Sequence, residues 1–178
     1  EVNELGQVIA NALGRRSDQL IIDALAGTTS ASVGTSGAPL TIETLLAAKR
    51  ALDAKGVPST DRYFVIESKG IEDLLKTTEV TSSDYNTVKA LVGGDLNSFL
   101  GFKIIQLADR AEGGIASDGT NFKGFAYHKR AVGFGLNMDI STKAEWVAHK
   151  QSWLSVGNLK AGAALIDNDG VVPVIYSI

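Results

Sequence analysis

Apolar residues recur at every third or fourth position from the start of the chain to Ala26, which is the period of an α-helix that buries one face. These apolar positions are Leu5, Val8, Ile9, Ala12, Leu13, Leu20, Ile21, Ala24 and Leu25. Gly27 follows them, and glycine is favoured just past a helix end. The pattern predicts one long helix over residues 1–26. Because the pattern already runs at Glu1, we expect a chain that is truncated at its N-terminus.

Shorter elements are predicted between residues 28 and 76. Residues 28–39 are small and polar, rich in Gly, Ser and Thr, and predict a domain boundary or an exposed loop. Thr41 is a suitable N-cap for a second helix. The spacing predicts that its buried face consists of Ile42, Leu45, Leu46, Lys49 and Leu52. Residues 62–66 predict a strand in the middle of a sheet, because both of its faces are apolar. A short helix is predicted from Ser68 onward.

The middle of the chain predicts a further helix, a strand and a loop. The helix covers residues 82–91, with Ser82 or Ser83 as its N-cap. Residues 102–107 predict the strand. Residues 109–120 are polar and Gly-rich, and predict an exposed loop.

Residues 121–178 contain most of the strand-like sequence, so the helices must bury their apolar stripes against this part of the chain. Apolar and polar positions alternate from residue 158 to residue 165, as in a half-buried strand. Residues 167–170, Asp-Asn-Asp-Gly, predict a hairpin turn. Pro173 predicts either that the last strand lies at a sheet edge or that this residue occupies a ladder position that needs no donor. Residues 143–152 do not alternate, and their buried face is left open.

Composition and charge exclude several classes of function. A chain of 178 residues with 44% hydrophobic residues can form a core without cross-links, and it has no cysteine. Disulfides, thiol chemistry and cysteine-bound zinc are therefore excluded. The 17 basic and 20 acidic residues give a net charge of -3, which disfavours direct binding to nucleic acid. No apolar run approaches the roughly 20 residues that span a bilayer, so no membrane partner is expected.

Candidate chemistry is sparse. Asp167, Asp169 and Gly170 resemble the start of a calcium loop, but the glycine and glutamate that complete such a loop are missing, so no metal is expected. Glycines 133 and 135 lack the third glycine of a dinucleotide site, so no cofactor is expected either. His128 and His149 lie on different segments and lack metal-ligand spacing. Structural histidines are favoured, while a small α+β hydrolase that uses His128 or His149 as its base stays open as an alternative.

Five stretches of the chain stand in a recognisable order. They are RRSDQLIIDALAG (15–27), ALDAKGVPSTDRYFVIES (51–68), GGDLNSFLGFKII (93–105), FAYHKRAVGFGLNMDI (125–140) and AGAALIDNDGVVPVIY (161–176). Together they resemble tailed-bacteriophage major capsid proteins of the Hong Kong 97 fold. The resemblance covers essentially the whole chain, and the order of the stretches is more specific than any one of them.

This resemblance implies an α+β fold with two domains. The peripheral domain would comprise residues 1–38 and 138–160, a long spine helix beside long antiparallel strands. The axial domain, a sheet flanked by helices, would comprise residues 39–137 and 161–178. In this family, an N-terminal arm and an extended loop precede the spine helix. The given sequence begins within the expected spine helix, so neither segment has a counterpart in it. The loop at residues 109–120 would be an axial-domain contact around a symmetry axis.

The same resemblance implies a non-enzymatic structural subunit with no catalytic, cofactor or metal site. Copies of the chain would form the pentamers and hexamers of an icosahedral shell in the virion, assembled in the host cytoplasm; a monomer is the alternative for the truncated chain. Other expected partners are scaffold and portal proteins, and packaged DNA that the shell encloses without sequence-specific binding. An encapsulin-like cellular nanocompartment shell is the alternative on the same fold.

Overall fold

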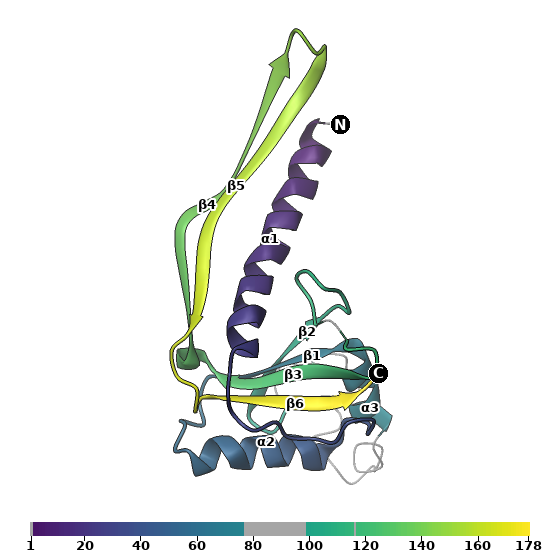
Figure 1. Ribbon diagram of the computed structural model, residues 1–178, viewed down its shortest axis with the longest axis vertical. Helices are drawn as coiled ribbons and strands as arrows, with labels where there is room; N and C mark the ends of the chain where they lie inside the picture. Colours follow the sequence, from purple (N-terminus) through teal and green to yellow (C-terminus); the bar gives the residue numbers. More distant parts are fainter. Residues whose placement is uncertain (1, 77–98, 116) are drawn as a thin grey trace.

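The computed structural model describes residues 2–76, 99–115 and 117–178 of the chain, and Figure 1 shows their arrangement. The helices are α1 (Val2–Ala26), α2 (Ile42–Ala54) and α3 (Ser68–Lys76), with a short 3-10 helix η1 (Lys129–Ala131). The strands are β1 (Arg62–Glu67), β2 (Phe102–Leu107), β3 (Asn121–His128), β4 (Val132–Val147), β5 (Ser152–Leu165) and β6 (Val171–Ser177). No helix among these residues is long and apolar enough to span a membrane.

One lobe of the molecule consists of α1 and the long hairpin β4–β5, which run side by side away from the rest of the chain (Figure 1). The predicted long helix is confirmed as α1. Its partner is the predicted half-buried strand, whose alternating positions turn one side of β5 toward α1. A Cβ at Gly157 would lie only 2.2 Å from Cγ2 of Ile9, so the absence of a side chain lets helix and strand approach this closely.

The other lobe is a four-stranded sheet of order β2-β1-β3-β6, in which β1 pairs in parallel with β2 and antiparallel with β3. The predicted central position of β1 and edge position of the last strand are therefore confirmed. Helix α2 covers one face of the sheet, and the C-terminal end of α1 meets the other (Figure 1). Thr41 is the N-cap of α2 as predicted, and its hydroxyl accepts a hydrogen bond from the Thr44 N–H at 3.3 Å.

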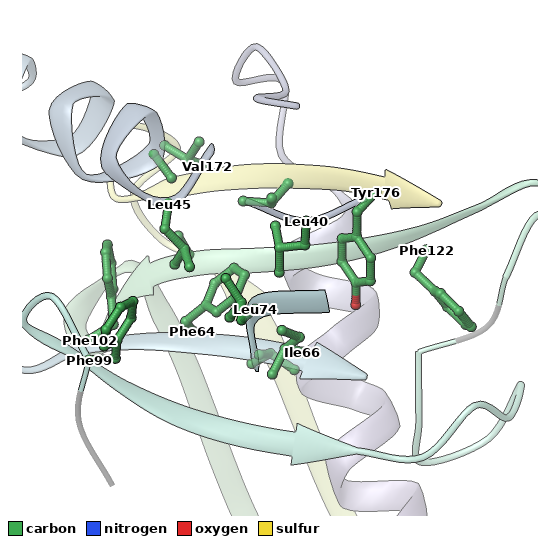
Figure 2. Packing of buried hydrophobic residues seen from close by; sticks show 14 of the residues in the cluster. Leu40, Leu45, Phe64, Ile66, Leu74, Phe99, Phe102, Phe122, Val172 and Tyr176 are labelled. Carbon is green, nitrogen blue, oxygen red and sulfur yellow. The ribbon is translucent and has the colours of Figure 1, made fainter. Parts of the chain in front are cut away.

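The main core lies between the sheet and helices α2 and α3. Figure 2 shows Leu40, Leu45 and Leu74 packed over Phe64, Ile66 and Tyr176 from the strands. The buried side of α2 is Leu45, Ala48 and Leu52, whereas Leu46 is exposed. The predicted face was wrong at Leu46, because the seven-residue spacing from Leu45 to Leu52 sets the helix rotation and turns Leu46 away from the sheet.

The loop between α1 and α2 covers the open edge of β6. The N–H of Val33 donates to the Pro173 carbonyl, and the Ile175 N–H donates to the Val33 carbonyl, both at 2.8 Å. The Ser177 N–H donates to the Ala38 carbonyl at 2.8 Å. Residues 28–39 are mostly exposed, as predicted, but they also complete the hydrogen bonding of an edge strand that would otherwise be free to pair with another chain.

Two predictions about the second half of the chain need correction. Residues 167–170 are not a hairpin turn, because β5 pairs with β4 while β6 pairs with β3, so this segment crosses from one sheet to the other. The actual hairpin turn lies at residues 148–151, within the stretch that did not alternate; the Lys150 N–H donates to the Val147 carbonyl there. The helix predicted at residues 82–91 lies outside the described residues.

The loop at residues 109–120 is exposed only in part. Gly113, Gly114 and Ile115 are buried, and the Gly113 N–H donates to Oε1 of Gln19 on α1 at 2.9 Å. A Cβ at Gly113 would lie 2.5 Å from Cβ of Arg15. The prediction of an exposed loop is therefore wrong for residues 113–115, because contact with α1 was not visible in the local composition.

Candidate interaction surfaces

The end of the β4–β5 hairpin exposes two large aromatic side chains. Trp146 and Trp153 are register partners, with ring centroids 5.6 Å apart in an edge-to-face arrangement. They remain 50% and 58% exposed. Trp153 shares its strand face with Gly157, which faces α1, but the hairpin projects past the N-terminal end of α1 (Figure 1). The tryptophan pair lies beside the turn that ends this hairpin, and both rings are largely open to solvent. We call Trp146 and Trp153 the tip pair.

The opposite side of the hairpin end is also apolar. Leu154 and Val156 alternate with Trp153 and Ser155, so they point away from α1, and both are exposed. An exposed apolar surface on both sides of a narrow two-stranded arm is unfavourable in water. Such a surface is typical of a protein–protein contact.

Helix α1 carries a second exposed apolar stripe. Leu5 and Val8 are 54% and 64% exposed. They lie on the same helix face as Arg15 and Gln19, which contact the buried part of the 109–120 loop. This face of α1 is thus covered near its C-terminal half and open near its N-terminal half.

A third exposed apolar group lies at the root of the hairpin, where it leaves the sheet. It comprises Phe134, Leu136, Met138 and Ile166. The ladder between β4 and β5 is irregular here, with register shifts on either side of Met138. Such shifts change the twist of a strand pair, and Figure 1 shows the hairpin bending along its length.

The structure separates the two histidines. His128 is buried at the end of β3, where its Nδ1 accepts a hydrogen bond from the Arg130 N–H at 3.2 Å and caps η1. His149 lies in the exposed turn at the far end of the hairpin. Across residues 2–76, 99–115 and 117–178, neither histidine forms a hydrogen bond or ion pair with a carboxylate. Within the described part of the chain, the two histidines thus do not come together, and no carboxylate orients either of them.

The carboxylates of the former calcium-loop candidate are engaged in local contacts. Oδ1 of Asp167 accepts from the Asp169 N–H at 3.0 Å, and Asp169 forms an ion pair with Lys55 at 3.1 Å. Within the described part of the chain, no group of three or more acidic or histidine side chains could hold a metal ion. These residues serve the junction between the lobes.

Other charged groups have structural roles as well. The backbone N–H groups of Asn121 and Thr120 hold the pKa of the Asp118 carboxyl below its usual range, and so order the start of β3. Arg62, which is almost fully buried, donates to the Pro58 and Val57 carbonyls and pairs with Asp53 at 2.6 Å. It fixes the loop between α2 and β1.

A long helix beside an antiparallel hairpin, joined to a separate α+β lobe, is the architecture of Hong Kong 97-type viral capsid subunits. A solved structure from Mycobacterium phage Che8 superposes with a TM-score of 0.73 over 93% of this chain and 60% of that chain, at 21% sequence identity. The acid-stable capsid structure of Helicobacter pylori bacteriophage KHP30 superposes with a TM-score of 0.71, over 100% of this chain and 68% of that chain, at 11% identity.

The family model described as phage capsid protein matches residues 1–177, and the chain belongs to this family. A virus-like particle from Pyrococcus furiosus has the same fold, with a TM-score of 0.58 and 18% identity over 91% of this chain and 63% of that chain. No curated protein sequence matches the chain. The chain spans 60% of the length of the Che8 protein, 64% of the cyanophage P-SCSP1u capsid protein and 66% of the phage KHP40 head protein.

The resemblance drawn from the order of short sequence stretches is thus confirmed in its family and its fold. Sequence reasoning missed the tip pair as a surface. A signal for it was present, because Trp146 lies within and Trp153 directly after the stretch at residues 143–152 that does not alternate, and a hairpin turn interrupts alternation in this way. What the sequence did not contain was the position of this turn relative to α1.

Proposed function

We propose that the chain is the structural subunit of an icosahedral phage capsid, which assembles with copies of itself into pentamers and hexamers in the virion. The observation that carries the proposal is the exposed tip pair, on an arm that projects from a fold shared with capsid subunits. A monomer exposes such aromatic surface at a cost, whereas repeated contacts between copies would bury it.

The two lobes would carry the two domain roles of the family. Residues 1–38 and 138–160 form the peripheral domain in this proposal, and residues 39–137 and 161–178 form the axial domain. The β4–β5 hairpin itself begins at Val132 and ends at Leu165, so its root extends into the axial assignment. Exposed apolar groups lie at the hairpin end, at the hairpin root and on α1, which gives a subunit several separate contact surfaces.

We propose no catalytic role for the chain. Its function would be mechanical, through many weak contacts that add up in a closed shell. DNA would be enclosed without sequence-specific contacts, and scaffold and portal proteins would be further partners. A cell-encoded nanocompartment is less well supported, because the matching family model is that of phage capsid proteins.

The test is to weaken the tip pair without changing the strands. In the protein at the full length encoded by its gene, Trp146→Thr with Trp153→Thr removes the aromatic area and introduces β-branched residues, which also favour strands. We expect the double variant to fold and to yield few or no shells by electron microscopy and sedimentation. Truncating buried aromatic anchors at interfaces costs about 2–4 kcal/mol each.

Lys150→Thr is the matched control, because it changes an exposed polar residue in the turn beside the pair. The control should assemble like the wild-type protein. If the double variant formed shells in wild-type yield, this would show that the tip pair is not an assembly contact. Failure of the wild-type protein to form any particle under all conditions tested would contradict the capsid function itself.

A further inference from the structure

The chain passes between the two lobes at three places, and these crossings meet at one junction. The first crossing follows α1, at residues 27–30. The second is η1, between β3 and β4, and the third is residues 166–170, between β5 and β6. The N–H groups of Ile166 and Asp167 both donate to the Ala131 carbonyl, at 2.8 and 3.2 Å, and thereby join the second crossing to the third.

An apolar cluster underlies this junction. Ile22 and Leu25 from α1 pack against Phe125 and Val171 from the sheet and against Ala131 from η1. The cluster holds the lobes together, because all five side chains are buried. Apolar contacts are not directional, however, so they restrain the distance between the lobes more than the angle between them.

The directional contacts at the junction converge on Asn168. Its Oδ1 accepts hydrogen bonds from the Thr28 hydroxyl at 2.7 Å and from the Thr29 N–H at 2.8 Å. Its backbone carbonyl accepts a third from the Ser30 hydroxyl at 2.7 Å. The exits of α1 and of the hairpin are therefore tied to each other through one side chain and one carbonyl.

Lys55, at the end of α2, connects this group to the sheet lobe. Its ammonium donates to the Ser30 hydroxyl at 3.0 Å and pairs with Asp169 at 3.1 Å. Hydrogen bonds require both distance and alignment, so a network that spans both lobes constrains their angle.

We propose that Asn168, with Thr28, Ser30 and Lys55, is a polar latch that fixes the angle between the α1–hairpin lobe and the sheet lobe. With the latch closed, the molecule holds one angle. Without it, the apolar cluster acts as a pivot about which the lobes swing. This inference concerns the single chain and does not depend on shell assembly.

The test measures the distance between the lobes directly. The sequence contains no cysteine, so cysteines introduced by Lys150→Cys in the hairpin turn and Ala47→Cys on the exposed side of α2 accept spin labels at no other position. Pulsed electron paramagnetic resonance then gives the distance distribution in solution. We expect a single narrow distance in the wild-type background.

Asn168→Ala should shift this distance or broaden it, because both hydrogen bonds to Oδ1 are lost. Asn168→Asp keeps an acceptor oxygen at the same place and should restore the narrow distribution. Thr28→Val, which removes one donor and keeps the shape, should have an intermediate effect. Asn158→Ala, on the exposed side of the hairpin, is the control and should change nothing.

A merely structural role for Asn168 would lower the unfolding temperature without moving the distance, so both quantities are measured on each variant. An unchanged narrow distance in folded Asn168→Ala and Thr28→Val proteins would overturn the proposal, and would assign the angle to the apolar cluster. A loss of the narrow distance in Asn168→Asp as large as that in Asn168→Ala would also overturn it.

Discussion

Tyr176 joins the last strand to the central strand through a single polar contact inside the core. The ring is fully buried, and its hydroxyl oxygen accepts a hydrogen bond from the Glu67 N–H at 3.1 Å. Burial strongly raises the pKa of this hydroxyl, since the phenolate would lose its hydration, and the nearby Glu67 and Asp73 carboxylates act in the same direction. Folding therefore favours the neutral form of the Tyr176 hydroxyl.

This raised pKa predicts a loss of stability in alkali. The unfolded chain releases the Tyr176 proton near the ordinary tyrosine value, about pH 10, whereas the folded chain retains it. The contribution is present below that pH and is lost as the pH rises above it. Urea unfolding measured between about pH 9 and pH 11.5 should show this decline.

Tyr176→Phe should flatten the alkaline decline and lower stability at neutral pH by about 1–3 kcal/mol, because the Glu67 N–H loses its acceptor. Tyr63→Phe is a control at a ring that is only partly buried. An alkaline decline of the same slope in the Tyr176→Phe protein would show that another group causes it.

Among the elements, the loop between α1 and α2 has a larger role than its composition suggests. It runs along β6 and is held there by the bridge between Val33 and Val174. Gly34 makes this approach possible: its φ is +99°, and a Cβ there would lie 2.2 Å from the Ile175 carbonyl oxygen. The loop thus depends on one glycine to cover the sheet edge.

Gly34→Ala should release this cover and destabilise the protein by more than the roughly 1–3 kcal/mol that an unfavourable backbone conformation costs alone. The Ile175 amide should then exchange faster with solvent. Gly37→Ala is the matched control, since Gly37 has a φ of +76° but open space around it. Equal losses in the two variants would mean that strain, and not the contact with β6, is the cause.

On the scale of the whole molecule, the lobes differ in what they need from each other. The sheet lobe has its own core, formed by α2, α3 and the four strands. The other lobe is one helix against a two-stranded ribbon, and a two-stranded ribbon alone is marginal in water. The lobe formed by α1 and the β4–β5 hairpin should therefore depend on the sheet lobe for its stability.

Replacing residues 137–160 by Asn-Gly tests this dependence, because Leu136 and Ala161 are register partners and a two-residue turn can join them. We expect the sheet lobe to keep its near-ultraviolet circular dichroism and slow amide exchange. The first half of α1 should lose its exchange protection, since its stripe no longer has a partner. Loss of protection throughout β1 and β3 would contradict the independence of the sheet lobe.

Periodicity in the sequence determined the long helix, the capped second helix, the central strand and the alternating strand β5, because each depends on residues close together in the chain. It also indicated the family, since the order of these elements is itself a sequence property. The Thr41 cap and the Pro173 edge followed from the chemistry of single residues.

Only the tertiary structure decided which strands pair and which surfaces stay open. Asp167 to Gly170 has the local chemistry of a hairpin turn, but pairing of β5 with β4 and of β6 with β3 made it the crossing that carries Asn168. The exposure of the tip pair likewise depends on the pairing of β4 with β5, which places both tryptophans beside the hairpin turn. Local sequence sets the conformation of a segment, whereas its partners are chosen by contacts between residues far apart in the chain, and the surfaces through which this protein would assemble are what those contacts leave uncovered.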